Sequence, residues 1–73
     1  MTLTELRCLV AIVEADLNIS AAAQNMHSTQ PALSRHLKQL EDELGFQIFS
    51  RRGRSLVEVT PAGEEVLKIA RRV

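Results

Sequence analysis

The stretch from residue 28 to residue 45 constrains the fold most, because it has the pattern of one helix with a start, two faces and an end. Ser28 or Thr29 can cap the first free backbone N–H groups, and Pro31 is tolerated in a first helical turn. Gly45 can adopt the left-handed conformation that ends a helix. Four leucines between these ends recur at helical spacing and predict one apolar stripe. They are Leu33, Leu37, Leu40 and Leu44.

The second face of this predicted helix carries side chains that suit nucleic acid. It lies about a third of a turn from the leucine stripe, at ~100° per residue. Its members are Gln30, Pro31, Ser34, Arg35 and Lys38. Glutamine can pair with adenine, arginine with guanine, serine with either and lysine with a phosphate. The acids Glu41, Asp42 and Glu43 lie in the C-terminal half of the helix, away from the N-terminal end that would enter a DNA groove. Taken alone, the helix also fits an amphipathic surface helix with a solvated polar face.

The residues before this helix predict two more helices. Residues 2–5 fit a capping box, and the helix that follows is expected to end near Ala15 or Asp16. Ser20 is a good N-cap for a short helix over residues 21–26, whose three alanines let helices approach closely. Two helices joined by a short turn, the second with a Gln/Ser/Arg face, form the helix-turn-helix pattern.

After the glycine that ends the central helix, the apolar period changes from helical to alternating. Residues 46–50 predict a strand with Ile48 and Phe49 on opposite sides. Residues 51–54 predict a basic turn, and residues 56–59 a returning strand. Such a hairpin beside a helix-turn-helix is a wing, with arginines placed for phosphates or a narrow minor groove. A hairpin standing alone would more simply be a solvated basic turn.

The last segment predicts a helix that pairs with another subunit. Thr60 can cap it, Pro61 fits its first position, and Glu64 and Glu65 suit the positive end of the helix dipole. Its apolar residues form a wide surface: Val66, Leu67, Ile69, Ala70 and Val73. Because no glycine or asparagine stop appears, we expect the helix to continue past Val73 in a longer protein. A small domain has little core with which to cover it.

Composition limits the chain to one small domain of 73 residues. Nine basic and nine acidic residues balance, so whole-chain charge does not indicate nucleic acid, although a local basic surface is possible. The single cysteine, Cys8, lies in an apolar pattern and is expected to be a packed thiol without a disulfide. No run reaches membrane-spanning length and no signal-peptide pattern is present, which predicts a cytosolic protein without a membrane partner.

The sequence does not indicate an enzyme. Cys8, His27 and His36 lack metal-ligand spacing, and Ser34 and His36 diverge on a helix, so we expect no metal, cofactor or catalytic residues. Sequence-specific binding of DNA by a dimer is the first hypothesis. A winged-helix module that binds protein, or DNA without sequence preference, is the alternative. An apolar exposed face on the central helix would favour a protein partner, and the sequence shows none.

In this order and spacing, the residues resemble the N-terminal domain of LysR-type transcriptional regulators, which are bacterial. The resemblance covers the whole chain and is carried by Leu6-Arg7, Ala22-Ala23, residues 28–35, residues 40–45, Phe49-Ser50-Arg51 and residues 60–63. Within the family, the chain is most similar to the CysB branch, whose members regulate sulfur assimilation. The segments that carry this closer likeness are residues 16–20, 41–51 and 59–63. Cys8 departs from the family, where an aromatic residue is common at this position.

The resemblance implies a mostly α-helical fold with a small β-hairpin. Residues 1–59 would form a winged helix-turn-helix DNA-binding domain, and residues 60–73 would begin a long linker helix for dimerisation. It also implies double-stranded DNA as a partner, a two-fold operator, a homodimer through the last helix, and a tetramer in the full-length protein. A separate C-terminal domain, absent from this chain, would bind a small-molecule effector.

The resemblance further implies roles for particular residues. One set would meet bases or nearby backbone in the major groove: Gln30, Pro31, Ser34 and Arg35. A second set would meet phosphates: Thr29 and Lys38. The arginines of the wing would be Arg51 and Arg54, with Arg52 as an additional contact.

Overall fold

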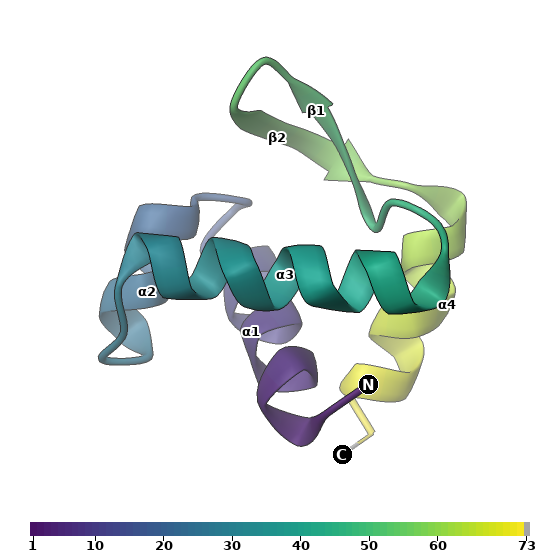
Figure 1. The fold of residues 1–73 in the computed structure, drawn as a ribbon, viewed down its shortest axis with the longest axis horizontal. Coiled ribbons are helices and arrows are strands. Elements are labelled where there is room, and N and C mark those ends of the chain that lie inside the picture. The colour runs from purple at the N-terminus through teal and green to yellow at the C-terminus, as the bar shows by residue number, and fades with distance from the viewer. Residues whose placement is uncertain (73) are drawn as a thin grey trace.

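The computed structural model describes residues 1–72, which form four helices and one antiparallel hairpin (Figure 1). In chain order these elements are α1 (Leu3–Glu14), α2 (Ile19–Asn25), α3 (Gln30–Leu44), β1 (Phe49–Arg52), β2 (Ser55–Val59) and α4 (Pro61–Ala70). The predicted class, mostly helical with a small hairpin, is confirmed.

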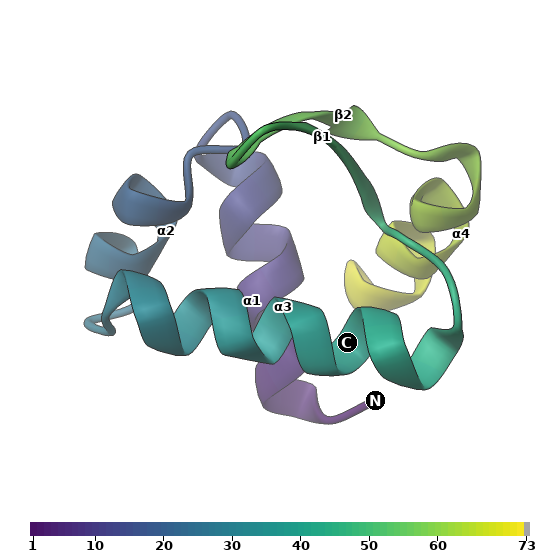
Figure 2. The same ribbon diagram turned by 45° about the horizontal axis from the view of Figure 1, so that its top comes forward.

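Helix α1 is the centre of the packing, because it contacts α2, α3 and α4. Figures 1 and 2 show α3 running across α1, with α2 near one end of α3 and α4 near the other. The predicted leucine stripe faces this core: Leu33, Leu37 and Leu40 are buried, and Leu44 packs against them half-buried. The opposite side of α3 therefore remains available to solvent.

Most predicted helix ends are confirmed by their capping contacts. Thr2 and Glu5 form the reciprocal capping box of α1, with N–H to oxygen distances of 3.0 and 3.1 Å. Thr29, rather than Ser28, caps α3 by accepting a hydrogen bond from the Ala32 N–H. At the other end of α3, Gly45 has a φ of 80°, as expected for a left-handed C-cap. Thr60 caps α4.

The predicted cap of the second helix is wrong by two residues. Asn18, not Ser20, is the N-cap of α2, and its Oδ1 accepts a hydrogen bond from the Ala21 N–H at 3.0 Å. The cause is the connection from α1, where Asp16 and Leu17 have φ values of 56° and 64°. These two left-handed residues turn the chain before Asn18, so that Asn18 has the extended conformation of an N-cap.

The predicted first strand starts too early. Residues 46–48 precede β1, and Ile48 and Phe49 are both fully buried. The backbone N–H of Ile48 donates to the Glu41 carboxylate at 2.7 Å, which holds this segment against α3 before the hairpin begins. The turn is also shorter than predicted, since it lies between Arg52 and Ser55.

Helix α4 returns to the core at the end of the hairpin. Val66, Leu67 and Ala70 are buried, whereas Ile69 is half exposed. The described helix ends at Ala70, and the expected continuation past Val73 lies outside the described residues. None of the helices formed by residues 1–72 is long and apolar enough to span a bilayer.

The single cysteine is a packing residue. Cys8 is buried in the core cluster, as the apolar pattern around it predicts. Burial raises the pKa of the Cys8 thiol, and the nearby Glu5 carboxylate raises it further. The thiol therefore stays protonated at neutral pH.

Candidate nucleic-acid interface

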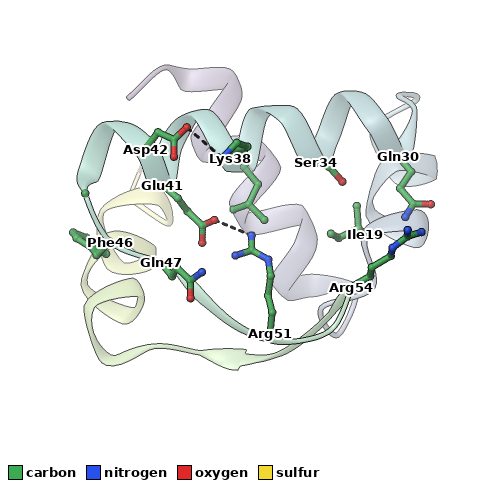
Figure 3. Close-up of a pocket in the computed structure, with 12 residues that line it drawn as sticks. Ile19, Gln30, Ser34, Lys38, Glu41, Asp42, Phe46, Gln47, Arg51 and Arg54 are labelled. Atoms are coloured by element: carbon green, nitrogen blue, oxygen red, sulfur yellow. Dashed lines mark hydrogen bonds and ion pairs between the residues drawn. The ribbon is translucent and has the colours of Figure 1, made fainter.

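The exposed face of α3 and the β-hairpin form the two walls of an open groove of about 730 Å³ (Figure 3). The hairpin extends from the α4 end of the molecule back along α3 (Figure 2). Five residues predicted to contact DNA line this groove: Gln30, Ser34, Lys38, Arg51 and Arg54. Residues from distant parts of the sequence thus share one concave surface.

The remaining predicted contacts lie outside the groove. Pro31 and Arg35 are exposed on α3, one residue along the helix from Gln30 and Ser34. Thr29 is exposed at the start of α3, where its hydroxyl oxygen caps the helix. Arg52 is exposed in β1. Helix α3 therefore presents two adjacent exposed stripes, one lining the groove and one beside it.

Arg51 is held by a buried carboxylate rather than projecting freely. Its Nη2 donates to Glu41 Oε1 at 2.8 Å, and its side chain is 30% exposed (Figure 3). The other Glu41 oxygen accepts the backbone N–H groups of Ile48 and Phe49. This cluster ties the base of the hairpin to α3 and fixes the distance between the walls.

The role of Glu41 was missed in the sequence. Its place beside Asp42 and Glu43 predicts an acid kept away from DNA, yet it is buried and holds the hairpin. A signal was present, because residue 41 follows Leu37 by four positions and so lies on the apolar side of the helix.

The remaining charges of the groove differ in how firmly they are held. Lys38 pairs with Asp42 at 3.7 Å, but both side chains are more than half exposed, so this pair is weak and easily exchanged for a phosphate. Arg54 lies in the hairpin turn after Gly53, whose φ is 61°. Within residues 1–72, Arg35 and Arg54 take part in no salt bridge.

Gln30 has a partner that the sequence did not reveal. The Ser20 hydroxyl donates a hydrogen bond to Gln30 Oε1 at 2.7 Å and so joins α2 to the first residue of α3. Figure 3 shows the Gln30 amide and the Arg54 guanidinium at the same end of the groove. Ile19 and Phe46 also line the groove, which gives it apolar surface at either end.

The described side chains show no arrangement for holding a metal. No group of at least three His, Cys, Asp or Glu residues among residues 1–72 is placed for that purpose. The polar and cationic face of α3 and the hairpin together line the groove. Helices α1, α2 and α3, of which α2 and α3 form the helix-turn-helix pair, and the hairpin that follows define a winged helix-turn-helix domain.

The chain belongs to the lysR family of bacterial regulatory helix-turn-helix proteins, because a sequence model of that family matches residues 3–64. The transcriptional regulator CysB of Haemophilus influenzae is 42% identical over 71 residues, which cover 97% of this chain and 22% of that protein. CysB of Thiocapsa roseopersicina is 47% identical over 70 residues, which cover 96% of this chain and 52% of that protein. The chain thus spans about half, or less, of the length of these relatives.

The fold also matches that of a solved protein–DNA complex. The crystal structure titled CbnR_DBD-DNA complex superimposes with a TM-score of 0.88 at 38% identity, covering 99% of this chain and 80% of that one. The predicted resemblance to LysR-type regulators, and to CysB among them, is confirmed by these comparisons.

Proposed function

We propose that this domain binds double-stranded DNA with sequence preference, by placing the N-terminal half of α3 in the major groove. The observation that carries the proposal is the face of α3 with exposed Gln30 and Arg35 and half-buried Ser34, which has the cationic hairpin beside it. An α-helix about 10–12 Å across fits a major groove about 12 Å wide. The similar CbnR domain was crystallised as a complex with DNA, which supports the same assignment.

The proposal includes two kinds of contact, to base edges and to phosphates. Gln30, Ser34 and Arg35 read base edges, and Pro31 packs against bases or nearby backbone. Cationic and hydroxyl groups around them neutralise or bind phosphates and set the register. The groups assigned to phosphates or to the adjoining minor groove are Thr29, Lys38, Arg51, Arg52 and Arg54. Glu41 does not oppose this arrangement, because it is buried and paired with Arg51.

The surface of α3 favours nucleic acid over a protein partner. Within residues 1–72, the exposed large apolar side chains are Met1, Leu3, Phe46, Val57 and Ile69, none of which belongs to α3. A protein-binding helix would present such side chains at its centre.

The family and the CysB relatives support a more specific proposal on domain division, dimerisation and the genes controlled. We propose that residues 1–59 are the DNA-binding domain and that residues 60–73 begin a linker helix. In the longer protein this helix makes a dimer that reads a two-fold operator, and a separate domain binds an effector. Control of sulfur assimilation is supported by 42–47% identity to proteins named CysB. Occurrence of the operator upstream of sulfur-assimilation genes is the expected result of a genome search.

Replacing Arg35 with alanine is expected to weaken binding to the preferred duplex by about 1–3 kcal/mol, the range for losing one good base contact. Binding to random duplex should change much less, because the lost contact is with a base. Duplexes selected from a random library by the wild-type protein and by Arg35→Ala measure both quantities. Arg7→Ala, which removes an exposed cation of α1, is the matched control. If neither protein enriches a motif, sequence-specific binding is refuted.

Removing the cation at the hairpin turn should have a different signature. Arg54→Ala is expected to weaken all duplexes similarly and to reduce the slope of log K against log[salt] by about one unit, because one phosphate contact is lost. Fluorescence anisotropy titrations at several salt concentrations measure this slope. An unchanged slope would mean that Arg54 contacts no phosphate.

A further inference from the structure

The hydroxyl of Ser20 is not needed to hold its own helix. Asn18 already caps α2, since its Oδ1 accepts the Ala21 N–H at 3.0 Å. Ser20 is the second residue of that helix and is exposed. Its hydroxyl instead donates across the helix-turn-helix to Oε1 of Gln30 at 2.7 Å. The contact therefore connects the supporting helix to a side chain assigned to base reading.

This hydrogen bond restricts where the Gln30 amide lies relative to a base. A glutamine amide carries an acceptor and a donor that exchange places when the amide rotates by half a turn. Adenine needs a fixed order of the two, with Oε1 accepting from N6 and Nε2 donating to N7. A serine hydroxyl can donate or accept, so it holds the amide in place under either order, and in this structure it donates to Oε1. It leaves the second lone pair of Oε1 and both Nε2 hydrogens available.

We propose that Ser20 is a specificity-determining positioning residue, which holds the Gln30 side chain in place so that its amide can read adenine. The inference rests on the proposed binding of DNA by α3. Ser20 acts through Gln30 and makes no base contact of its own. Because the contact already holds the Gln30 side chain in place, less side-chain entropy is lost when Gln30 binds.

The test compares Ser20→Ala, Ser20→Thr, Gln30→Ala and the double variant Ser20→Ala/Gln30→Ala with wild type. Each is titrated against the duplex that wild type selects and against duplexes changed at the base pair whose preference Gln30→Ala loses. Ser20→Ala should lower the preference for adenine at that pair about three- to tenfold, the size of effect that one neutral hydrogen bond produces. Ser20→Thr, which keeps the hydroxyl, should retain the preference. In the Gln30→Ala background, Ser20→Ala should change nothing further.

Three outcomes would overturn the inference. One is an unchanged preference in Ser20→Ala. Another is an equal loss on every duplex that persists without Gln30, which would mean that Ser20 binds a phosphate directly. The third is a motif that Gln30→Ala does not alter, in which case Gln30 reads no base although the domain still binds specifically. If wild type selects no motif at all, the proposed function itself fails.

A matched control distinguishes the effect of holding Gln30 in place from the effect of α2 stability. Asn18→Ala removes the cap of the same short helix and is expected to lower thermal stability. It should leave the base preference at the Gln30 position unchanged, because the Ser20 hydroxyl and its acceptor are retained. A shift in preference with Asn18→Ala as large as that with Ser20→Ala would assign the effect to the helix rather than to the hydroxyl.

Discussion

Replacing Glu41 with alanine should lower the free energy of unfolding by about 2–4 kcal/mol, in the range for unpairing buried hydrogen-bonded charges. The Glu41 carboxylate is 9% exposed and accepts from Arg51 and from the backbone N–H groups of Ile48 and Phe49. Its loss leaves buried donors unpaired where the hairpin leaves α3. Denaturant unfolding followed by circular dichroism measures the change.

Two companion variants identify the cause of that loss. Glu41→Gln keeps the shape and an acceptor but removes the charge, so its cost should lie between that of wild type and that of alanine. Asp42→Asn alters the neighbouring exposed pair with Lys38 and should cost less than about 1 kcal/mol. Equal costs for Glu41→Ala and Asp42→Asn would show that Glu41 does not hold the hairpin.

The second large effect is expected at Gly63, in the first turn of α4. A Cβ built there would lie 2.3 Å from the carbonyl oxygen of Ile48 and 2.9 Å from its Cα. Both atoms are backbone, so relief requires moving α4 away from the segment that leads into β1. Gly63→Ala should therefore destabilise the domain by about 3 kcal/mol or more, at the upper end for overpacking. The midpoint of thermal unfolding should fall accordingly.

The exposed neighbour Ala62 provides the comparison for Gly63. Ala62→Gly changes the same helical turn in the opposite direction and should cost no more than about 1 kcal/mol, the difference in helix propensity. If Gly63→Ala were neutral or stabilising, the close approach of α4 to Ile48 would be contradicted.

Local signals account for what the sequence predicted correctly. Both ends of α3 and the start of α4 were predictable because Thr29, Gly45 and Thr60 act within their own helical turns. The leucine stripe of α3 was predictable because burial follows the helical period. The polar face of Gln30, Ser34, Arg35 and Lys38 follows from the same geometry.

The errors arose where contacts between segments decide the structure. The start of β1 depends on Glu41 accepting from Ile48, seven residues along the chain, and no local pattern contains that contact. The start of α2 depends on positive φ at Asp16 and Leu17, and these residue types do not predict a positive φ. For the same reason the Ser20–Gln30 contact and the pairing of Arg51 were not predicted. Residue types identified the face, and tertiary contacts determine how each side chain is held.

The most direct test of the central claim is to map the DNA-bound surface by NMR. The ¹⁵N-labelled protein would be titrated with its selected duplex while backbone amide signals are followed. We predict that signals of residues 29–38 and 51–54 shift or broaden most. Signals on the far side of α1, around Arg7, and in α4, around Glu65, should change little. Changes concentrated in α1 and α4, with residues 29–38 unaffected, would contradict DNA binding by α3 and the hairpin.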